Sequence, residues 1–165
     1  TMIILASKSP RRKELLSKEI KDFLIVEANI NEDISYQLET PLEAVRDIAQ
    51  RKAFDVYKRY PNDTVIAADT IVVLNNEIIH KPKDETDAYK ILKNLSNKTH
   101  EVITSFAIIK DDNLVLKYVI SKVTFNLLSD KLINDYIASG SPLDKAGAYG
   151  IQDNDKYNIV KEYSG

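Results

Sequence analysis

The 165-residue sequence contains no cysteine and no long apolar run, and it has only four glycines. Without cysteine the chain can form no disulfide, no thiolate zinc site and no cysteine nucleophile, which agrees with a reducing compartment. Every apolar run is far too short to span a bilayer, and the N-terminus lacks the apolar stretch of a signal peptide. We therefore expect a soluble cytoplasmic protein with no membrane partner.

The sequence also lacks a strong excess of charge of either sign, because 23 basic and 25 acidic residues leave a net charge of -2. Such a chain has no general attraction for nucleic acid, so we expect no nucleic-acid partner. It contains neither G-x-x-x-x-G-K-[ST] nor G-x-G-x-x-G, which argues against P-loop and dinucleotide sites. Histidine-ligated zinc and serine-hydrolase chemistry are disfavoured because H-E-x-x-H spacing and a serine elbow are absent.

The first third of the chain predicts an α/β fold. Residues 2–7 and 23–26 are typical of strands, and they flank a helix predicted at residues 10–18. The capping box of residues 40–43 predicts a second helix that runs to about Tyr60.

The rest of the chain adds strands and two more helices. The predicted elements are a strand at residues 64–74 that turns at Asn75-Asn76, a helix capped by Asp84, a hairpin of residues 102–109 and 114–127, and a short helix capped by Ser129. A chain of this length can bury one core, so we expect a single domain over residues 1–165, shaped into two lobes.

Two arginines lie in the first turn of the first predicted helix, where the helix dipole disfavours positive charge. Ser9 fits its N-cap and Pro10 its first position, so Arg11 and Arg12 lie beside unpaired amides and the positive end of the helix dipole. A phosphate would be bound by the amides, the serine hydroxyls and the guanidinium groups together. The alternative is a surface turn with two solvated arginines.

Lys52 and Asp69 also stand where a charge is unexpected. Lys52 falls on the apolar stripe of its helix with Val45, Ala49 and Val56, so it needs an acidic partner unless its stem carries the ammonium out to water. Asp69 is the only charge in the β-branched run of residues 64–74, where burial is costly unless the acid faces a cleft, a cation or a metal. A purely structural salt bridge is the competing explanation for Asp69.

Three of the four glycines lie within residues 140–152, which indicates backbone packed closely against another segment. The charges with no obvious structural reason are the cations Arg11, Arg12, Lys52, Lys81 and Lys145 and the carboxylates Glu32, Asp69 and Asp144. Magnesium prefers a few carboxylates with waters and phosphate oxygens, while arginines and lysines hold the remaining charge. The set therefore predicts a site for a nucleoside triphosphate and a divalent metal.

Four ordered blocks between residues 3 and 152 resemble the Maf family of nucleoside triphosphate pyrophosphatases. They are ILASKSPRRKELL, AADTIVVLNNEIIHKP, KTHEVITSFAI and SPLDKAGAYGIQ. The segment DKAGAYGIQ resembles the branch that acts on dTTP and UTP rather than the branch associated with 7-methyl-GTP. The resemblance implies a Maf-like α/β fold, similar to inosine triphosphate pyrophosphatase, in which a mixed sheet with flanking helices surrounds a long central cleft.

The resemblance implies hydrolysis between the α and β phosphates, with Mg²⁺ or Mn²⁺ required, by a homodimer. Asp69 aligns with the catalytic acid, which either deprotonates the attacking water or holds the metal, and Glu32 aligns with an acidic position that helps to hold it. The matched substrate positions are Ser7, Arg11, Arg12, Lys52 and Lys81 for the phosphates and Arg11, Thr70 and Gln152 for the base, with Lys145 added from the unexplained cations. The amide of Gln152 can pair with the O4 and N3–H edge of uracil or thymine.

The sequence departs from the family pattern in three places. Ser105 stands where the family commonly has glycine, and residues 153–156 replace a loop richer in glycine. The chain stops at Gly165, where the family continues through a further stretch and a last helix, so we expect the sequence to be incomplete. Two alternatives stay open: a nucleotide-binding regulator of septum formation with little turnover, and a pyrophosphatase that prefers purine triphosphates such as 7-methyl-GTP or inosine triphosphate.

Overall fold

The computed structural model describes residues 1–165, which form two compact units. Unit 1 comprises residues 1–70 and 104–119, and unit 2 comprises residues 71–103 and 120–165. In chain order the elements are β1 (Ile3–Leu5), α1 (Pro10–Ser17), β2 (Leu24–Ile25), α2 (Glu32–Ser35), α3 (Pro41–Tyr57), β3 (Thr64–Leu74), β4 (Glu77–Ile79), α4 (Glu85–Leu95), β5 (Thr99–Lys110), β6 (Asn113–Phe125), α5 (Asp130–Ala138), the 3-10 turns η1 (Ser141–Asp144), η2 (Ala146–Ala148) and η3 (Ile151–Asp153), α6 (Asn154–Tyr157) and β7 (Val160–Ser164). No helix is both long and apolar enough to cross a membrane.

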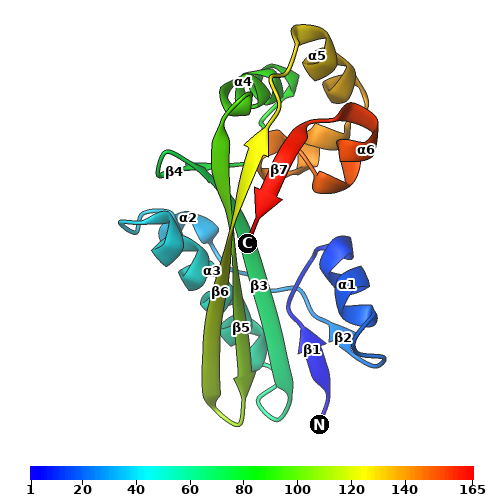
Figure 1. The fold of residues 1–165 in the computed structure, drawn as a ribbon. Coiled ribbons are helices and arrows are strands. Elements are labelled where there is room, and N and C mark those ends of the chain that lie inside the picture. Colours follow the sequence, from blue (N-terminus) through cyan, green and yellow to red (C-terminus); the bar gives the residue numbers. More distant parts are fainter. The chain divides into compact units, whose positions relative to one another are not determined.

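Unit 1 is built on parallel strands joined by helices. β1 pairs in parallel with both β2 and β3, and β3 is followed in the hydrogen-bonded strand order by β5 and β6. Parallel strands need crossover connections. α1 connects β1 to its neighbour β2, and the connection from β2 to β3, on the other side of β1, contains α2 and α3. Figure 1 shows α3 along one face of these strands, where Ala49, Ala53 and Val56 pack with Val65 and Ala107 in one apolar core.

The helix boundaries of unit 1 follow their capping residues. The Ser9 hydroxyl accepts a hydrogen bond from the Arg12 amide, and the Thr40 hydroxyl accepts one from the Glu43 amide, as predicted. α3 ends at Tyr57, three residues before the predicted end. Pro61 limits the helix at this end, because it has no amide proton to continue the hydrogen bonds and disfavours a helical conformation at Tyr60.

Unit 2 contains an antiparallel part of the sheet and the second core. β3 turns back into β4 through Asn75 and Asn76, whose positive φ angles of 50° and 67° suit the predicted two-residue turn. β7 pairs antiparallel with β6. The core of unit 2 packs α4 and α5 with the end of β6, and its largest fully buried side chains include Tyr136 and Phe125.

The glycine-rich segment of unit 2 packs closely at Gly147. A Cβ atom there would lie 3.1 Å from both methyl groups of Val72, and the residue has a φ of +72°. Both constraints favour glycine, since a side chain would have to displace a β-branched neighbour and adopt a left-handed backbone. The prediction of closely packed backbone is confirmed at this position.

His100 in unit 2 gives a pH-dependent stability. The imidazole is 2% exposed, its Nε2 lies 2.6 Å from the Tyr149 hydroxyl, and burial lowers its pKa from 6.5 to about 4. Because the unfolded state binds the proton more readily, the contribution of neutral His100 to the free energy of unfolding is fully present above pH 6.5. This contribution is lost as the pH falls towards 4. The difference corresponds to about 3 kcal/mol.

We therefore expect the free energy of unfolding to fall by about 3 kcal/mol more between pH 6.5 and 4 in the unaltered protein than in His100→Gln. Urea unfolding at a series of pH values measures both slopes. The amide of glutamine can still reach the Tyr149 hydroxyl but does not titrate, so equal slopes in the two proteins would contradict the assignment.

Candidate active site

Asp69 lies in β3 with an ammonium group on one of its carboxylate oxygens. The residue is 8% exposed, and its Oδ1 lies 3.1 Å from the Nζ of Lys52 on α3. The Lys52 side chain is 19% exposed and does not carry its charge out to water. The acidic partner that the apolar stripe of α3 requires is therefore Asp69.

The second oxygen of Asp69 has no partner. Oδ2 is buried and forms no hydrogen bond. Burial raises the pKa of Asp69, and Lys52 only partly opposes this effect. A structural salt bridge explains the position of Oδ1, but it leaves Oδ2 unsatisfied, which is costly in a buried carboxylate. The site therefore has capacity for a further ligand on this atom.

Glu32 supplies a second carboxylate to the same ammonium group. Glu32 begins α2, its Oε1 lies 3.6 Å from Lys52 Nζ, and its side chain is 43% exposed. Its negative charge adds to the rise in the pKa of Asp69. Two carboxylates, one of them with an unpartnered buried oxygen, fit a hard divalent cation that completes its shell with water and phosphate oxygens. No group of three or more acidic or histidine side chains forms a complete metal cage.

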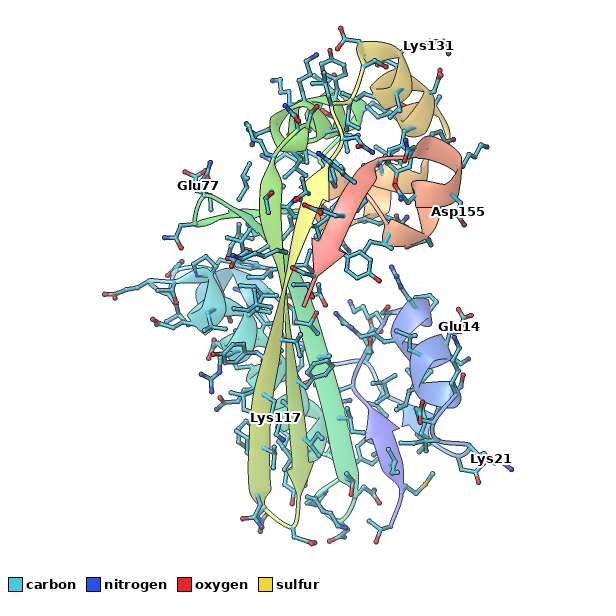
Figure 2. The ribbon with its side chains drawn as sticks, in the orientation of Figure 1. Glu14, Lys21, Glu77, Lys117, Lys131 and Asp155 are labelled. Carbon is cyan, nitrogen blue, oxygen red and sulfur yellow. The ribbon has the colours of Figure 1, made fainter.

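Arg12 is the arginine of the first helix that turns towards these acids. Its Nη2 donates to the Thr70 hydroxyl at 3.3 Å, and Thr70 Oγ1 lies 2.9 Å from Thr104 Oγ1. Burial lowers the pKa of Arg12, while Asp69 and Glu32 act in the opposite direction. Figure 2 shows Glu14 on the side of α1 turned away from β1; Glu14 is exposed, whereas Arg12 is half-buried.

Arg11 and Ser7 differ from Arg12 in their surroundings. Arg11 is exposed and forms no ion pair or side-chain hydrogen bond, so the structure leaves its predicted role untested. Ser7 is buried, and its hydroxyl oxygen accepts a hydrogen bond from the Ser9 amide at 3.0 Å. This bond shapes the turn that leads into α1 and leaves the Ser7 hydroxyl proton available for an acceptor.

The other predicted substrate residues belong to unit 2. Lys81 and Gln152 are exposed. Lys145 Nζ donates to the carbonyl oxygen of Ser141 at 2.7 Å and also contacts Asp144. Their roles in substrate binding stay predictions.

Two residues near Asp69 were not predicted from the sequence. Burial raises the pKa of Tyr36, and the negative charges of Asp69 and Glu32 raise it further. Thr104 faces Thr70 from the neighbouring strand. Neither residue stands out in the sequence, since a tyrosine and a threonine are ordinary in half-buried positions.

The sequence is similar to those of known proteins. A family model described as Maf-like protein matches residues 2–165. The chain is 48% identical to the dTTP/UTP pyrophosphatase of Pyrococcus furiosus, covering 96% of this chain and 87% of the relative. It is 47% identical to the dTTP/UTP pyrophosphatase of Clostridioides difficile, covering 91% of this chain and 78% of the relative.

Solved structures share the fold at low sequence identity. The Staphylococcus aureus Ham1 protein aligns with a TM-score of 0.55 and 16% identity, covering 95% of this chain and 91% of that chain. A nucleoside-triphosphatase / dITP/XTP pyrophosphatase from Mycobacterium abscessus aligns with a TM-score of 0.52 and 14% identity, covering 76% and 74%. The mixed sheet with flanking helices, similar to inosine triphosphate pyrophosphatase, is therefore confirmed as the fold class.

Proposed function

Because the chain belongs to the Maf family, we propose that it is a nucleoside triphosphate pyrophosphatase that hydrolyses dTTP and UTP to the monophosphate and pyrophosphate. The names of the relatives support the substrate class. The observation that carries the proposal is the buried Asp69 carboxylate, with one oxygen on Lys52 and the other unpartnered, beside Glu32 and Arg12.

The residues of unit 1 have separate tasks in this reaction. Asp69 must be ionised, either to accept a proton from the attacking water or to act as a metal ligand, and Lys52 favours that charged form. Arg12 provides a planar donor group for phosphate oxygens. A divalent cation held by Asp69 and Glu32, Mg²⁺ or Mn²⁺, would neutralise phosphate charge and lower the pKa of bound water.

We assign further substrate contacts from the sequence. In this proposal Ser7, Arg11, Lys81 and Lys145 bind phosphates, and Arg11, Thr70 and Gln152 select the base. The order of the four family blocks supports these assignments. The homodimer, the cytoplasmic location and the use of modified pyrimidine triphosphates stay predictions.

The reaction is tested by product identification. Water attacks one of the two phosphorus atoms of the α–β anhydride and breaks that bond, so we expect UTP and Mg²⁺ to give UMP and pyrophosphate in equal amounts. Chromatography with ³¹P NMR distinguishes these products from UDP and orthophosphate, which would contradict the proposed bond cleavage. Nucleotide binding with negligible turnover would favour the regulator, and faster turnover of 7-methyl-GTP or inosine triphosphate would favour the purine alternative.

A further inference from the structure

Residues 27–35 of unit 1 run along α3 and are hydrogen-bonded to side chains of this region at four positions, Glu27, Asn29, Asn31 and Ser35. Four polar side chains make the contacts, three on α3 and the fourth, Arg59, in the turn just after it. Arg59 Nη2 donates to the Glu27 carbonyl oxygen at 3.0 Å, the Asn29 amide donates to Asp55 Oδ2 at 2.8 Å, Arg51 Nη1 donates to the Asn31 carbonyl oxygen at 2.9 Å, and the Ser35 hydroxyl donates to Asp47 Oδ2 at 2.7 Å. We refer to Asp47, Arg51, Asp55 and Arg59 as the α3 ladder.

The spacing of the α3 ladder matches the spacing of an extended chain. Its members are four residues apart, which is a rise of about 6 Å along a helix. Glu27, Asn29 and Asn31 are two residues apart, which is a rise of about 6.6 Å along an extended segment. Arg59, Asp55 and Arg51 therefore meet successive alternate backbone groups, and the two segments run in opposite directions.

Ordinary surface ion pairs do not explain this arrangement. Within the ladder the pairs Asp55–Arg59 and Asp47–Arg51 are separated by 3.1 and 3.9 Å, and partly exposed pairs of this kind contribute little to stability. Three of the four contacts reach main-chain atoms, so they fix the path of residues 27–31. The Asn29 amide is also the largest factor that lowers the pKa of Asp55, which keeps that acceptor ionised.

The opposite side of the same segment packs against the core of unit 1. Val26 and Ala28 contact the apolar cluster that includes Ala49 and Ala53 of α3. Alternate residues thus bury side chains in the core while the residues between them present backbone groups to the ladder. The segment is held from two directions.

The ladder is densest around Glu32. Arg51 Nη1 bonds the Asn31 carbonyl oxygen just before this residue and the Ser35 hydroxyl at 2.8 Å just after it. Ser35 is fully buried, and the Asn31 side chain caps α2 by accepting from the Asp33 amide. Arg51 therefore clamps both ends of the four-residue helix that Glu32 begins.

We propose that Arg51, supported by Asp47, is a positioning residue that holds the Glu32 carboxylate beside Lys52 and Asp69 for binding a divalent cation. This inference rests on the proposed function only for the use made of that cation. Lys52 follows Arg51 directly on α3. One turn of this helix therefore positions both the guanidinium group that holds the two ends of α2 and the Lys52 Nζ, which lies 3.6 Å from Glu32 Oε1.

The test uses Mn²⁺ binding to the nucleotide-free protein, measured by electron paramagnetic resonance. Loss of a supporting partner of a metal ligand typically weakens affinity by about 10- to 100-fold. We expect Arg51→Met to weaken Mn²⁺ binding by about 10-fold and to accelerate amide hydrogen exchange in residues 27–35. Arg46→Met is the matched control, because Arg46 lies on α3 but faces the Tyr118 ring instead of the ladder. Its Mn²⁺ affinity should stay within about twofold of the parent value.

A double-mutant cycle separates positioning from general destabilisation. In a Glu32→Gln background, Arg51→Met should weaken Mn²⁺ binding no further, since the carboxylate it positions is gone. Additive losses, an unchanged affinity in Arg51→Met, or no Mn²⁺ binding by the parent would each overturn the inference. Failure of the parent to hydrolyse UTP while the cycle gives the expected result would instead contradict the proposed function alone.

Discussion

Replacing Asp69 with Asn is expected to reduce kcat for UTP by at least about 10³-fold while the protein stays folded. The amide has nearly the shape of the carboxylate, but it can neither accept a proton from water nor offer an anionic oxygen to a metal. Release of pyrophosphate under saturating UTP and Mg²⁺ measures the loss. Asp22→Asn is a suitable control, because Asp22 is exposed and the same chemical change there should leave kcat unaltered.

The same substitution should not lower thermal stability. Burial raises the pKa of Asp69, so the native state disfavours the ionised form relative to the unfolded chain. A carboxyl group whose pKa is raised by folding makes its full contribution to stability below its ordinary pKa. That contribution decreases as the pH rises towards the pKa of the folded state. At pH 7 a neutral amide removes that cost, although Lys52 loses one partner and keeps Glu32.

We therefore expect the unfolding temperature of Asp69→Asn to equal or exceed that of the parent in calorimetry at pH 7. A fall of many degrees would mean that the carboxylate is mainly structural. Turnover above one tenth of the parent value would remove its catalytic role.

Local signals explain why most of the fold was predictable from the sequence. Ser9, Thr40, Asp84 and Ser129 each cap the helix that the sequence assigned to them. Such caps are formed within four residues of chain, so the pattern alone is sufficient.

The elements that the sequence did not predict depend on distant partners. α2 has only four residues, and its position is set by Arg51 and Asp47, which lie 12 or more residues away. A helix this short is not stable by its own propensity. α6 and β7 are similarly short, and four of the five β7 residues are exposed, so no apolar period marked the strand.

The candidate site was predictable where a residue contradicts its surroundings. A lysine on an apolar helix stripe and an acid in an apolar strand each require a partner, and the structure pairs Lys52 with Asp69. Tyr36 and Thr104 carry no such contradiction, since a tyrosine and a threonine are ordinary in half-buried positions. The unpartnered Oδ2 of Asp69 is a three-dimensional property that no sequence pattern encodes.

Replacing Lys52 with Met is expected to lower kcat/KM for UTP by about 10²-fold at neutral pH, through the charge state of Asp69 and the loss of a phosphate contact. Lys52 is the largest factor that lowers the pKa of Asp69. Without the ammonium group, burial and the charge of Glu32 both act to raise that pKa. The proposed reaction needs ionised Asp69. As the pH is lowered, the activity of the variant should therefore begin to fall at a higher pH than that of the parent.

The measurement is the pH profile of kcat/KM between about pH 5 and 10 at saturating Mg²⁺. The acidic limb of Lys52→Met should move to higher pH, so the deficit should be largest in acid and smaller in alkaline solution. Lys13→Met removes an exposed lysine from α1 and should leave the limb in place. A lost phosphate contact lowers kcat/KM equally at every pH, whereas a lost counter-charge also changes the pH at which Asp69 becomes ionised. A uniform loss with an unshifted acidic limb would therefore mean that Lys52 acts only by binding phosphate.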